Sequence, residues 1–573
     1  MDMRKIPVPP VLLIASTLLT VVSVSRVLWA QWLLSRAAYY VLFLLVIVWL
    51  IVLIHALRVL KPDLRRFFGN YGSGILFSVF LAGVIFISAQ PYFRVQTDES
   101  KILNVSRSMF LEHKTDNVSE GIQLSDGTYL PLFRNFPQRC LLFQFLTSLI
   151  HQGIGYRPWN PFILNFIVLS ALLSVIFIFC RRHFGPTAGF VAVLLVVSQP
   201  IFSLSASSGG LDLLSALFTF ISLMALEMFL NKPTPFYFNL LWMQLLMLAH
   251  TREETILFAV VMMLFLMVYR YFKFEWVKSS WVLGMTPVLL WPIVWQRVAI
   301  THAYLFEDPP GGIAFSPVHF IHHLGVLLAT ALRFDFRIPY ASAINLIGIG
   351  ALFYFMFLFV LKRWPKGTAG RHWVAMVTVS LALRLAVLCS YYFANPLNYL
   401  ASRFYIVFLV LLSILIVAFL HRKGILQRSP RGCVLAALLI FVPYHAVTVS
   451  DENMGSLYLN QEFRCVMDFM KEKSPKETLL ILDSPDMYSG RHLSVVNFDY
   501  ANENRKKLAE LLNYTQIHEI YVFQRFLPAS RQIDGAAQLD PGYQVTFIKY
   551  IAVSPGIWLR LSKLSSIDRT VAV

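Results

Sequence analysis

The chain has 573 residues, of which 57% are hydrophobic and only 14% are charged, and its mean hydropathy is +0.63. This composition excludes a soluble globular protein of this length and indicates a polytopic membrane protein. The formal net charge of +18 could suggest a nucleic-acid partner. The basic residues, however, lie in short segments between apolar runs, where they orient membrane helices. We therefore expect no nucleic-acid binding.

Apolar runs long enough to cross a bilayer recur along the chain. A run of about 17–25 residues spans the hydrocarbon core as an α-helix, and we predict an α-helical polytopic membrane protein with about thirteen transmembrane helices. No small-residue cleavage site follows the first run, so we expect a retained span and not a removed signal peptide. The runs lie near residues 10–32, 37–58, 71–92, 160–181, 186–206, 210–230, 235–250, 253–272, 280–299, 341–361, 372–394, 400–420 and 432–449.

Clusters of Lys and Arg in the short connections predict the orientation of these spans. With thirteen spans, all of the clusters fall on one side, which the positive-inside rule assigns to the cytoplasm together with the N-terminus. Without the short run at 235–250, the later clusters would fall on the opposite side. Residues 93–159, 301–340 and 450–573 are then expected outside the cytoplasm, and a bacterial inner membrane is the expected location.

The last segment has the composition of a soluble domain. Short apolar runs predict strands and one amphipathic stretch predicts a helix, so we expect a small α/β domain. The predicted strands lie at 478–482, 494–498, 519–523 and 544–552, and the predicted helix lies at 502–512.

The whole chain is therefore expected to have three parts. A transmembrane hairpin occupies residues 1–70, and a transmembrane domain with the outer loop 93–159 occupies residues 71–449. The extracytoplasmic α/β domain occupies residues 450–573.

An acidic pair, Asp98-Glu99, follows the third span closely. Carboxylates at the point where a helix leaves the bilayer can deprotonate a hydroxyl or amine, or hold a divalent cation near a lipid phosphate. The spacing of Ile102, Val105 and Met109 predicts a short amphipathic helix at the membrane interface directly after the pair. A second such helix is expected from Cys140 to His151.

Asp212 opens the sixth span from the outer side, after a turn of small residues, Ser207-Ser208-Gly209-Gly210. Small residues allow another group to approach the backbone closely. The carboxylate is either part of a site or a favourable negative charge in the first turn of a helix.

Two arginines are candidates for binding an anion, and a third lies within a predicted span. Arg252, in the outer turn Thr251-Arg252-Glu253-Glu254, presents a fork of donors that suits a phosphate, and Glu253 could orient it. Arg403 opens the twelfth span at headgroup depth and is the better phosphate ligand. Arg384 lies near the middle of the eleventh span, where an arginine normally faces a cavity or a partner, and we expect a structural role for it.

The histidines and cysteines offer weaker signals. His319, His322 and His323 would share one face of a helix, which allows a metal site but lacks a matching carboxylate in the sequence. The five cysteines are scattered without ligand spacing, so we infer neither a metal cluster nor a disulfide framework. Whether a divalent cation binds at the acidic pair stays open.

The order of these motifs resembles the GT-C superfamily of membrane glycosyltransferases. The similarity is closest to the branch that contains the protein O-mannosyltransferases and the aminoarabinose transferase of lipid A. That branch has an acidic motif in the first large outer loop with an interfacial helix behind it, as from Thr97 to Phe110. It also has a small-residue turn with an Asp that leads into a span, as from Ser207 to Asp212.

Two further motifs support the resemblance. The turn from Thr251 to Glu254 is similar to the Thr-Arg-x-Glu turn of that branch, with Glu253 in place of a common Pro. Arg403 is followed by aromatic residues, which resembles an arginine of that branch at the outer start of a late span. The resemblance covers about residues 71–420. The acidic loop here follows the third span and not the first, so residues 10–58 would be an added hairpin.

The resemblance implies an inverting transfer of a sugar from a polyprenyl-phosphate-linked donor to an acceptor at the outer face. Asp98 would be the general base on the acceptor, or a metal ligand, and Glu99 would support it. A donor of this kind fits the absence of a Gly-rich loop that cradles a nucleotide. The sugar and the acceptor, whether protein, lipid or glycan, are not indicated.

The resemblance also implies how the donor is held. Arg403 and Arg252 would bind the donor phosphate and stabilise it as it leaves. Asp212 and Glu253 would complete the acidic site.

Two other classes stay open. A lipid or solute transporter is one, although the two-fold internal repeat that transporters often have is not evident. An O-antigen ligase or polysaccharide polymerase is the other, and His319 to His323 in a late outer loop keep it open.

Overall fold

The computed structural model describes most of the chain, and it divides into two compact units. The first, called here the helical unit, comprises Met1–Tyr92, Gln138–Leu146 and Phe162–Asp451; the second, the sheet unit, comprises Phe93–Pro137, Thr147–Pro161 and Glu452–Val573. The residues described are 27–60, 63–89, 91–137, 139–271, 280–289, 291–295, 313–331, 343–360, 368–398, 401–450, 458–513, 516–530, 532–533, 538–554 and 556–567.

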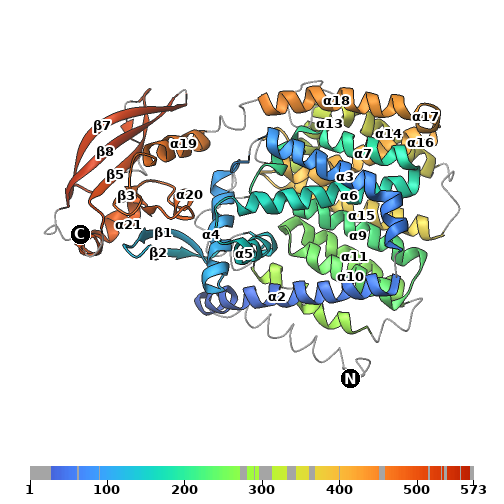
Figure 1. The fold of residues 1–573 in the computed structure, drawn as a ribbon, viewed down its shortest axis with the longest axis horizontal. Coiled ribbons are helices and arrows are strands. Elements are labelled where there is room, and N and C mark those ends of the chain that lie inside the picture. Colours follow the sequence, from blue (N-terminus) through green and yellow to red (C-terminus); the bar gives the residue numbers. More distant parts are fainter. Residues whose placement is uncertain are drawn as a thin grey trace. The chain divides into compact units, whose positions relative to one another are not determined.

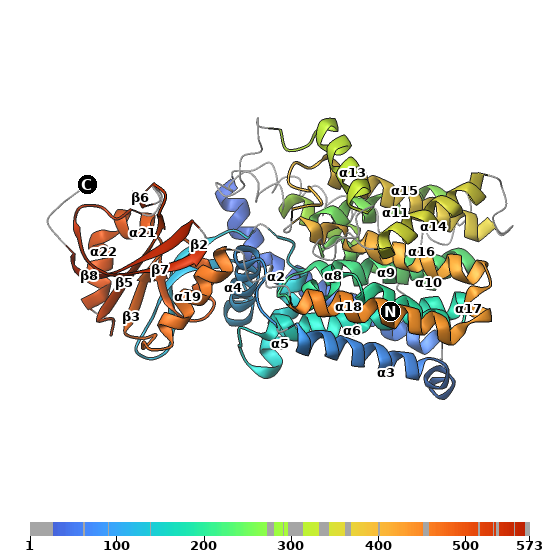
Figure 2. The ribbon, with the colours of Figure 1, turned by 90° about the horizontal axis from the view of Figure 1, so that it is seen from above.

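The helical unit is a bundle of apolar helices (Figure 1). Seen from above, α13, α14 and α15 lie along one side of the bundle and α3 lies along the opposite side (Figure 2). Its described helices are α2 (Val27–Leu60), α3 (Leu64–Ser88), α6 (Asn160–Phe184), α7 (Pro186–Val197), α8 (Pro200–Ala206), α9 (Asp212–Asn231), α10 (Pro235–Ala249), α11 (Glu253–Tyr271), η3 (Trp281–Leu289), α13 (Pro317–Ala331), α14 (Ala343–Val360), α15 (Thr368–Ser390), η5 (Ser402–Tyr405), α16 (Ile406–Arg422), α17 (Ile425–Arg428) and α18 (Pro430–Ser450).

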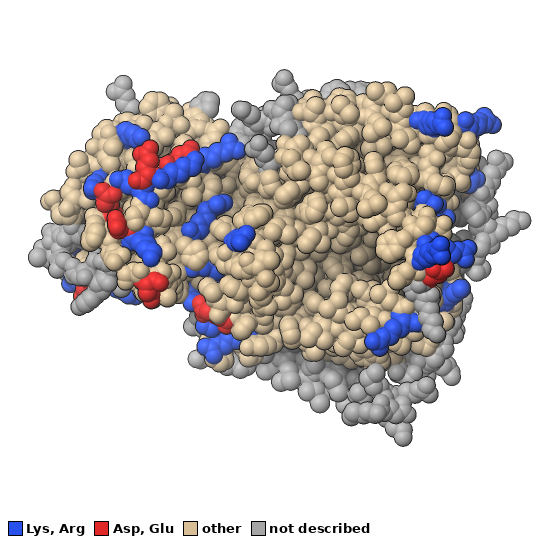
Figure 3. Space-filling view, viewed as in Figure 1, with Lys and Arg blue, Asp and Glu red and all other residues tan. Residues whose placement is uncertain are grey.

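The helices confirm a multi-pass membrane protein. Among the described residues, six helices are long and apolar enough to cross a membrane, and the bent pair α7–α8 would make a seventh. Four further apolar helices are shorter. The visible face of this unit is broad and nearly free of charge, with basic side chains gathered at its right-hand end in Figure 3. The number thirteen stays a prediction, because most of the run at 10–32 lies outside the described residues.

Three expected spans differ in form from the prediction. Helix α2 continues through residues 33–36, where a connection between two spans was expected. The span at 186–206 is bent by 78° between α7 and α8, because Pro200 cannot continue the hydrogen-bond ladder of α7. Residues 281–289 form a 3-10 helix that contains Pro287, where an α-helix was expected.

The centre of the bundle is the hairpin of α9 and α10. Helix α9 packs against α10, α15 and α16, and α10 also packs against α2 and α11, so that 78% of the span of α9 is buried. Only residues 232–234 join α9 to α10, and only residues 250–252 join α10 to α11. Such short connections make neighbouring helices antiparallel, so the start of α9, the end of α10 and the start of α11 lie at the same end of the bundle.

The sheet unit contains a mixed sheet of eight strands in the order β2-β1-β4-β3-β5-β8-β7, with β6 paired to β5. Strand β3 is parallel to β4 and β5, and the other pairs are antiparallel. The strands are β1 (Asn117–Gln123), β2 (Tyr129–Asn135), β3 (Thr478–Ile481), β4 (Ser494–Val496), β5 (Glu519–Leu527), β6 (Gln532–Ile533), β7 (Tyr543–Ser554) and β8 (Ile557–Ile567).

Helices cover both faces of this sheet. Helix α19 (Tyr458–Met470) packs its apolar side chains on one face, and α21 (Phe498–Glu503) and α22 (Arg505–Asn513) bury theirs on the other. The unit also contains α4 (Gln96–Glu112), the end of α5 (Leu142–Ile154) and α20 (Asp486–Ser489).

The four predicted strands are present as β3, β4, β5 and β7. Helices α4 and α5 lie where two interfacial helices were predicted, and their position at a membrane interface stays a prediction. The helix expected at 502–512 is two helices, α21 and α22, separated at Asn504. Sequence reasoning did not anticipate that the hairpin β1–β2, from the outer loop, belongs to the same sheet as the C-terminal strands through the pair Gly121–Val495. Strand β1 buries Ser119 and Glu120 as well as apolar residues, so its sequence lacks the alternation by which strands are recognised.

Candidate functional site

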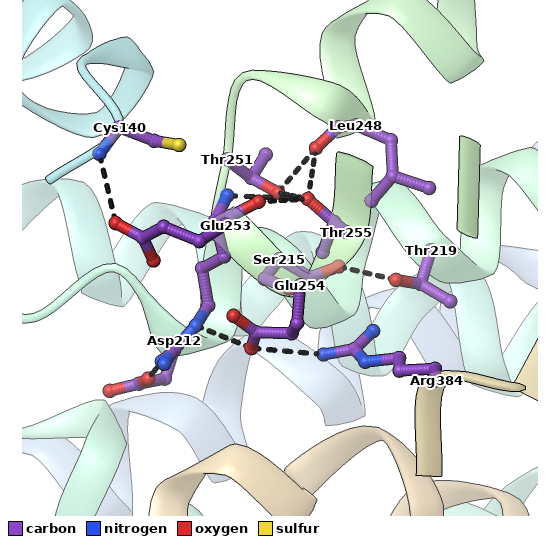
Figure 4. A network of polar contacts seen from close by, with 11 residues as sticks. Cys140, Asp212, Ser215, Thr219, Leu248, Thr251, Glu253, Glu254, Thr255 and Arg384 are labelled. Atoms are coloured by element: carbon purple, nitrogen blue, oxygen red, sulfur yellow. Dashed lines mark hydrogen bonds and ion pairs between the residues drawn. The ribbon is translucent and has the colours of Figure 1, made fainter. Parts of the chain in front are cut away.

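Charged side chains from three separate sequence motifs meet in the helical unit. Arg252 forms ion pairs with Asp212 and with Glu254, in which its Nε lies 2.7 Å from the Glu254 carboxylate. The same Oε1 atom of Glu254 accepts a hydrogen bond of 3.4 Å from Nη2 of Arg384 (Figure 4). These residues come from α9, the 250–252 turn, α11 and α15.

All four side chains are withdrawn from solvent. Asp212, Arg252 and Arg384 are 4%, 5% and 1% exposed, and the side chain of Glu254 is 10% exposed. Burying one of these charges alone would be very costly, whereas two carboxylates and two guanidiniums in contact compensate one another. Burial lowers the pKa of Arg252 from its ordinary value, the Glu254 carboxylate opposes that shift, and the nearby charges of Arg403 and Arg139 add to it.

Two threonine hydroxyls hold the turn that carries Arg252. Thr251 Oγ1 donates to the carbonyl of Leu248 at 2.7 Å. Thr255 Oγ1 lies 2.6 Å from the carbonyl oxygens of Leu248 and Arg252, and it accepts from the Arg252 amide at 3.3 Å (Figure 4). The turn is therefore closed by local hydrogen bonds, and the backbone of Arg252 is fixed independently of its ion pairs.

Glu253 points toward a different segment. Its Oε1 accepts a hydrogen bond of 3.3 Å from the Cys140 amide (Figure 4), and the Leu142 amide donates to the His250 carbonyl at 3.4 Å. These contacts attach residues 140–142 to the turn and bring Arg139 into the electrostatic environment of Arg252.

Arg403 lies in the 3-10 turn η5 and is half-buried. The neighbouring Phe404 ring has the Arg252 guanidinium 4.8 Å from its centroid and the Arg403 guanidinium 5.8 Å away. A guanidinium near a ring face is attracted by the negative face of the π-system. Phe404 thus links Arg403 to Arg252, so all the predicted site residues of the helical unit lie in one region.

Asp98 and Glu99 belong to the sheet unit, where they lie in the first turn of α4. Glu99 is 1% exposed, and its carboxylate accepts hydrogen bonds of 3.2 Å from the amides of Arg94 and Val95. It therefore satisfies backbone donors at the start of the helix, as the acidic member of a capping box does. Asp98 is half-buried.

The histidine triplet does lie on one helix, α13. The rings of His319 and His323 are stacked with centroids 6.0 Å apart, and His323 Nδ1 lies 2.9 Å from the Cys389 carbonyl. In the part of the chain that is described, no group of three or more His, Cys, Asp or Glu side chains is placed to hold a metal ion.

Sequence reasoning did not assign Glu254 and Arg139 to the site, and it gave Arg384 only an unnamed partner. Glu254 adjoins Glu253 in the same turn, and a sequence does not tell which of two adjacent glutamates faces an arginine. The partner of Arg384 is 130 positions away, which no local pattern predicts.

No protein-family model and no curated protein matches this chain. Among solved structures it is similar to ArnT from Cupriavidus metallidurans bound to undecaprenyl phosphate, with 14% sequence identity and a TM-score of 0.44, over 85% of this chain and 97% of that chain. It is also similar to the Archaeoglobus fulgidus oligosaccharyltransferase, with 10% identity and a TM-score of 0.41, over 81% and 73% of the two chains. Scores of this size carry no conclusion about the activity of this chain.

Proposed function

We propose that this protein is a membrane glycosyltransferase that moves a sugar from a polyprenyl-phosphate-linked donor to an acceptor at the extracytoplasmic face, in a bacterial inner membrane. The observation that carries the proposal is the convergence of Asp212, Arg252 and Arg403 in one region. They come from three motifs that are far apart in the sequence and that together resemble the GT-C pattern.

Each residue has a role in the proposed reaction. An acceptor hydroxyl or amine attacks the anomeric carbon as its proton passes to the Asp98 carboxylate. The bond between this carbon and the phosphate oxygen breaks, and the polyprenyl phosphate leaves with the electron pair. Arg403 and Arg252 stabilise the negative charge that develops on the phosphate.

The acidic residues have two tasks in this scheme: most hold other groups in place, and one accepts the proton. Asp212 is an ion-pair partner of Arg252 and keeps the guanidinium in place. Glu253 holds residues 140–142 through the Cys140 amide, and Glu99 orders the start of α4 next to Asp98. Only Asp98 is assigned a proton transfer.

The test is sugar transfer by the purified full chain in lipid, from a panel of labelled polyprenyl-phosphate sugars to membrane lipids, glycans and peptides. Asp98→Asn should lower turnover on the order of 10³-fold, because it removes the general base. An EDTA arm distinguishes a base, which is insensitive to chelation, from a ligand of a divalent cation.

The matched control is Asp126→Asn, an exposed aspartate in the β1–β2 turn of the same unit. Its turnover should remain within about twofold of wild type, since substitutions remote from a site rarely alter it strongly. Full turnover by Asp98→Asn would remove Asp98 from the mechanism. Wild-type protein that moves the intact lipid across the bilayer without transferring sugar would favour a transporter.

A further inference from the structure

Arg384 is a buried arginine for which the proposed reaction has no direct use. It is 1% exposed and lies in α15, a helix that otherwise consists mainly of apolar residues. An arginine in such a position needs a specific partner. Its ion-pair partner among the described residues is Glu254, while its Nε and Nη1 atoms are buried without a hydrogen bond in that part of the chain.

Glu254 holds two arginines with one oxygen atom. Oε1 lies 2.7 Å from Nε of Arg252 and 3.4 Å from Nη2 of Arg384. The negative charge on this oxygen attracts both guanidiniums and so holds both in place. The position of α15 is thereby linked to the turn that follows α10.

The orientation of Arg252 follows from its two acidic partners. Its Nη1 contacts Asp212 and its Nε lies 2.7 Å from Glu254, so the guanidinium is held between two carboxylates. It also lies 4.8 Å from the Phe404 ring.

We propose that Glu254 and Arg384 are positioning residues for Arg252. Arg384 holds Glu254, and Glu254 together with Asp212 holds the Arg252 guanidinium in the orientation that receives the donor phosphate. The inference rests on the transferase function proposed above for the reaction itself, but the ion-pair chain can be tested without it. Glu254 and Arg384 contact neither the sugar nor the acceptor in this scheme.

The experiment uses the full chain in lipid with Glu254→Gln, Arg384→Met and the double variant. Each single change should lower kcat/KM for the donor on the order of 10²-fold, the effect of a displaced binding group, with the acceptor KM within twofold of wild type. The double variant should have a donor kcat/KM no lower than that of the less active single variant, because the two residues act as a unit. Arg384→Lys keeps the positive charge but loses the planar guanidinium. Its donor kcat/KM should lie between those of Arg384→Met and wild type.

A second measurement reads the position of Arg252 directly. Phenylglyoxal modifies accessible arginines, and mass spectrometry of the modified protein reports each one. Arg252 should be protected in wild type and modified in both single variants, while the buried Arg107 of the sheet unit stays protected. The control is Glu227→Gln, which breaks the 3.1 Å pair with His183 near the other end of α9 and should change neither readout.

The outcomes separate this inference from the proposed function. If wild type transfers sugar and both single variants keep donor kcat/KM within twofold, the positioning role is wrong and the transferase stands. If wild type transfers sugar from no polyprenyl donor, the transferase proposal fails and the modification arm decides alone. Arg252 protected equally in wild type and variants would then overturn the positioning role, and Arg252 exposed in the variants would support it.

Discussion

Two buried charge sites, one in each unit, are stabilised in different ways, although the sheet unit also contains an ion pair between the buried Glu462 and Arg525. In the helical unit, Asp212 and Glu254 are neutralised by Arg252 and Arg384, and the four residues come from elements that are distant in sequence. In the sheet unit, the Glu99 carboxylate is stabilised by the backbone amides of Arg94 and Val95, which lie within five positions of it.

Buried cations show the same contrast. Arg107 of the sheet unit is 5% exposed, as Arg252 is, but its described contacts are of another kind. Its guanidinium donates to the Ser489 carbonyl at 3.1 Å and lies 4.3 Å from the centroid of the Tyr129 ring. Backbone groups inside an apolar helix are bonded to one another, so a buried charge there needs a side-chain partner. Irregular segments offer free amides and carbonyls in either unit, as Cys140 does to Glu253.

The largest expected effect compares these two arginines. Arg252→Met leaves Asp212 without its guanidinium partner and Glu254 with Arg384 alone, so unfolding should become about 3–5 kcal/mol easier. Arg107→Met removes hydrogen bonds to the Ser489 carbonyl and to His492 Nδ1 and the contacts with two aromatic rings, for a loss of about 2–3 kcal/mol. Denaturant titration of the full chain in one detergent measures both. Equal losses would break the contrast between the units.

Glu120 of the sheet unit is a further buried carboxylate for this comparison. It accepts a hydrogen bond of 3.2 Å from the Asn497 amide and not from an arginine. Burial raises the pKa of Glu120 from 4.5 to about 7, the amide opposes the shift, and Asp499 and Asp486 add to it. The folded state therefore keeps a proton that the unfolded state has lost above pH 4.5. The free energy of unfolding that Glu120 contributes is fully present below pH 4.5 and is lost as the pH rises through about 7. The total loss is about 3 kcal/mol.

Glu120→Gln should reduce this dependence on pH. Amide hydrogen exchange in β1, corrected for the intrinsic rate, should show wild-type protection falling relative to that of the variant as the pH rises from 5 to 7. A shallow slope should remain, because burial also raises the pKa of Asp486, with Lys101 opposing. His492, whose pKa is lowered from 6.5 to about 4, chiefly by burial, stays neutral in the folded protein but takes up a proton below about pH 6.5 when unfolded. Its contribution to stability therefore rises between pH 5 and 6.5 in both proteins, and the difference between their slopes isolates Glu120. An identical slope in both proteins would mean that Glu120 titrates outside the range.

The smallest expected effect concerns the acidic pair itself. Glu99→Ala removes the acceptor of two amides at the start of α4 and should cost about 1–2 kcal/mol of stability, as the loss of a helix cap does. Asp98→Asn should cost less than about 1 kcal/mol, the size of a helix-dipole interaction. The same denaturant titration, with hydrogen exchange in the first turn of α4, measures both. Unchanged stability in Glu99→Ala together with abolished sugar transfer would give Glu99 the catalytic role that the resemblance implies.

The amino-acid sequence was sufficient for the properties that depend on local composition and spacing. Apolar runs predicted the membrane helices, short apolar runs predicted β3, β4, β5 and β7, and the positions of Ile102, Val105 and Met109 predicted α4. The sequence also placed Asp212, Arg252 and Arg403 in one candidate site. The helices and strands follow from hydrophobic periodicity, which is read over a few neighbouring residues. The site follows from an order of motifs that resembles the GT-C pattern.

Only the tertiary structure decided which charges meet. It selected Glu254 over Glu253 as the partner of Arg252, supplied Glu254 as the partner of Arg384, and joined β1 to the C-terminal sheet. The physical reason is that an ion pair acts over a few ångströms in space, and its strength is independent of separation along the chain. The antiparallel hairpin of α9 and α10 and the packing of α11 against α15 bring these groups within that distance.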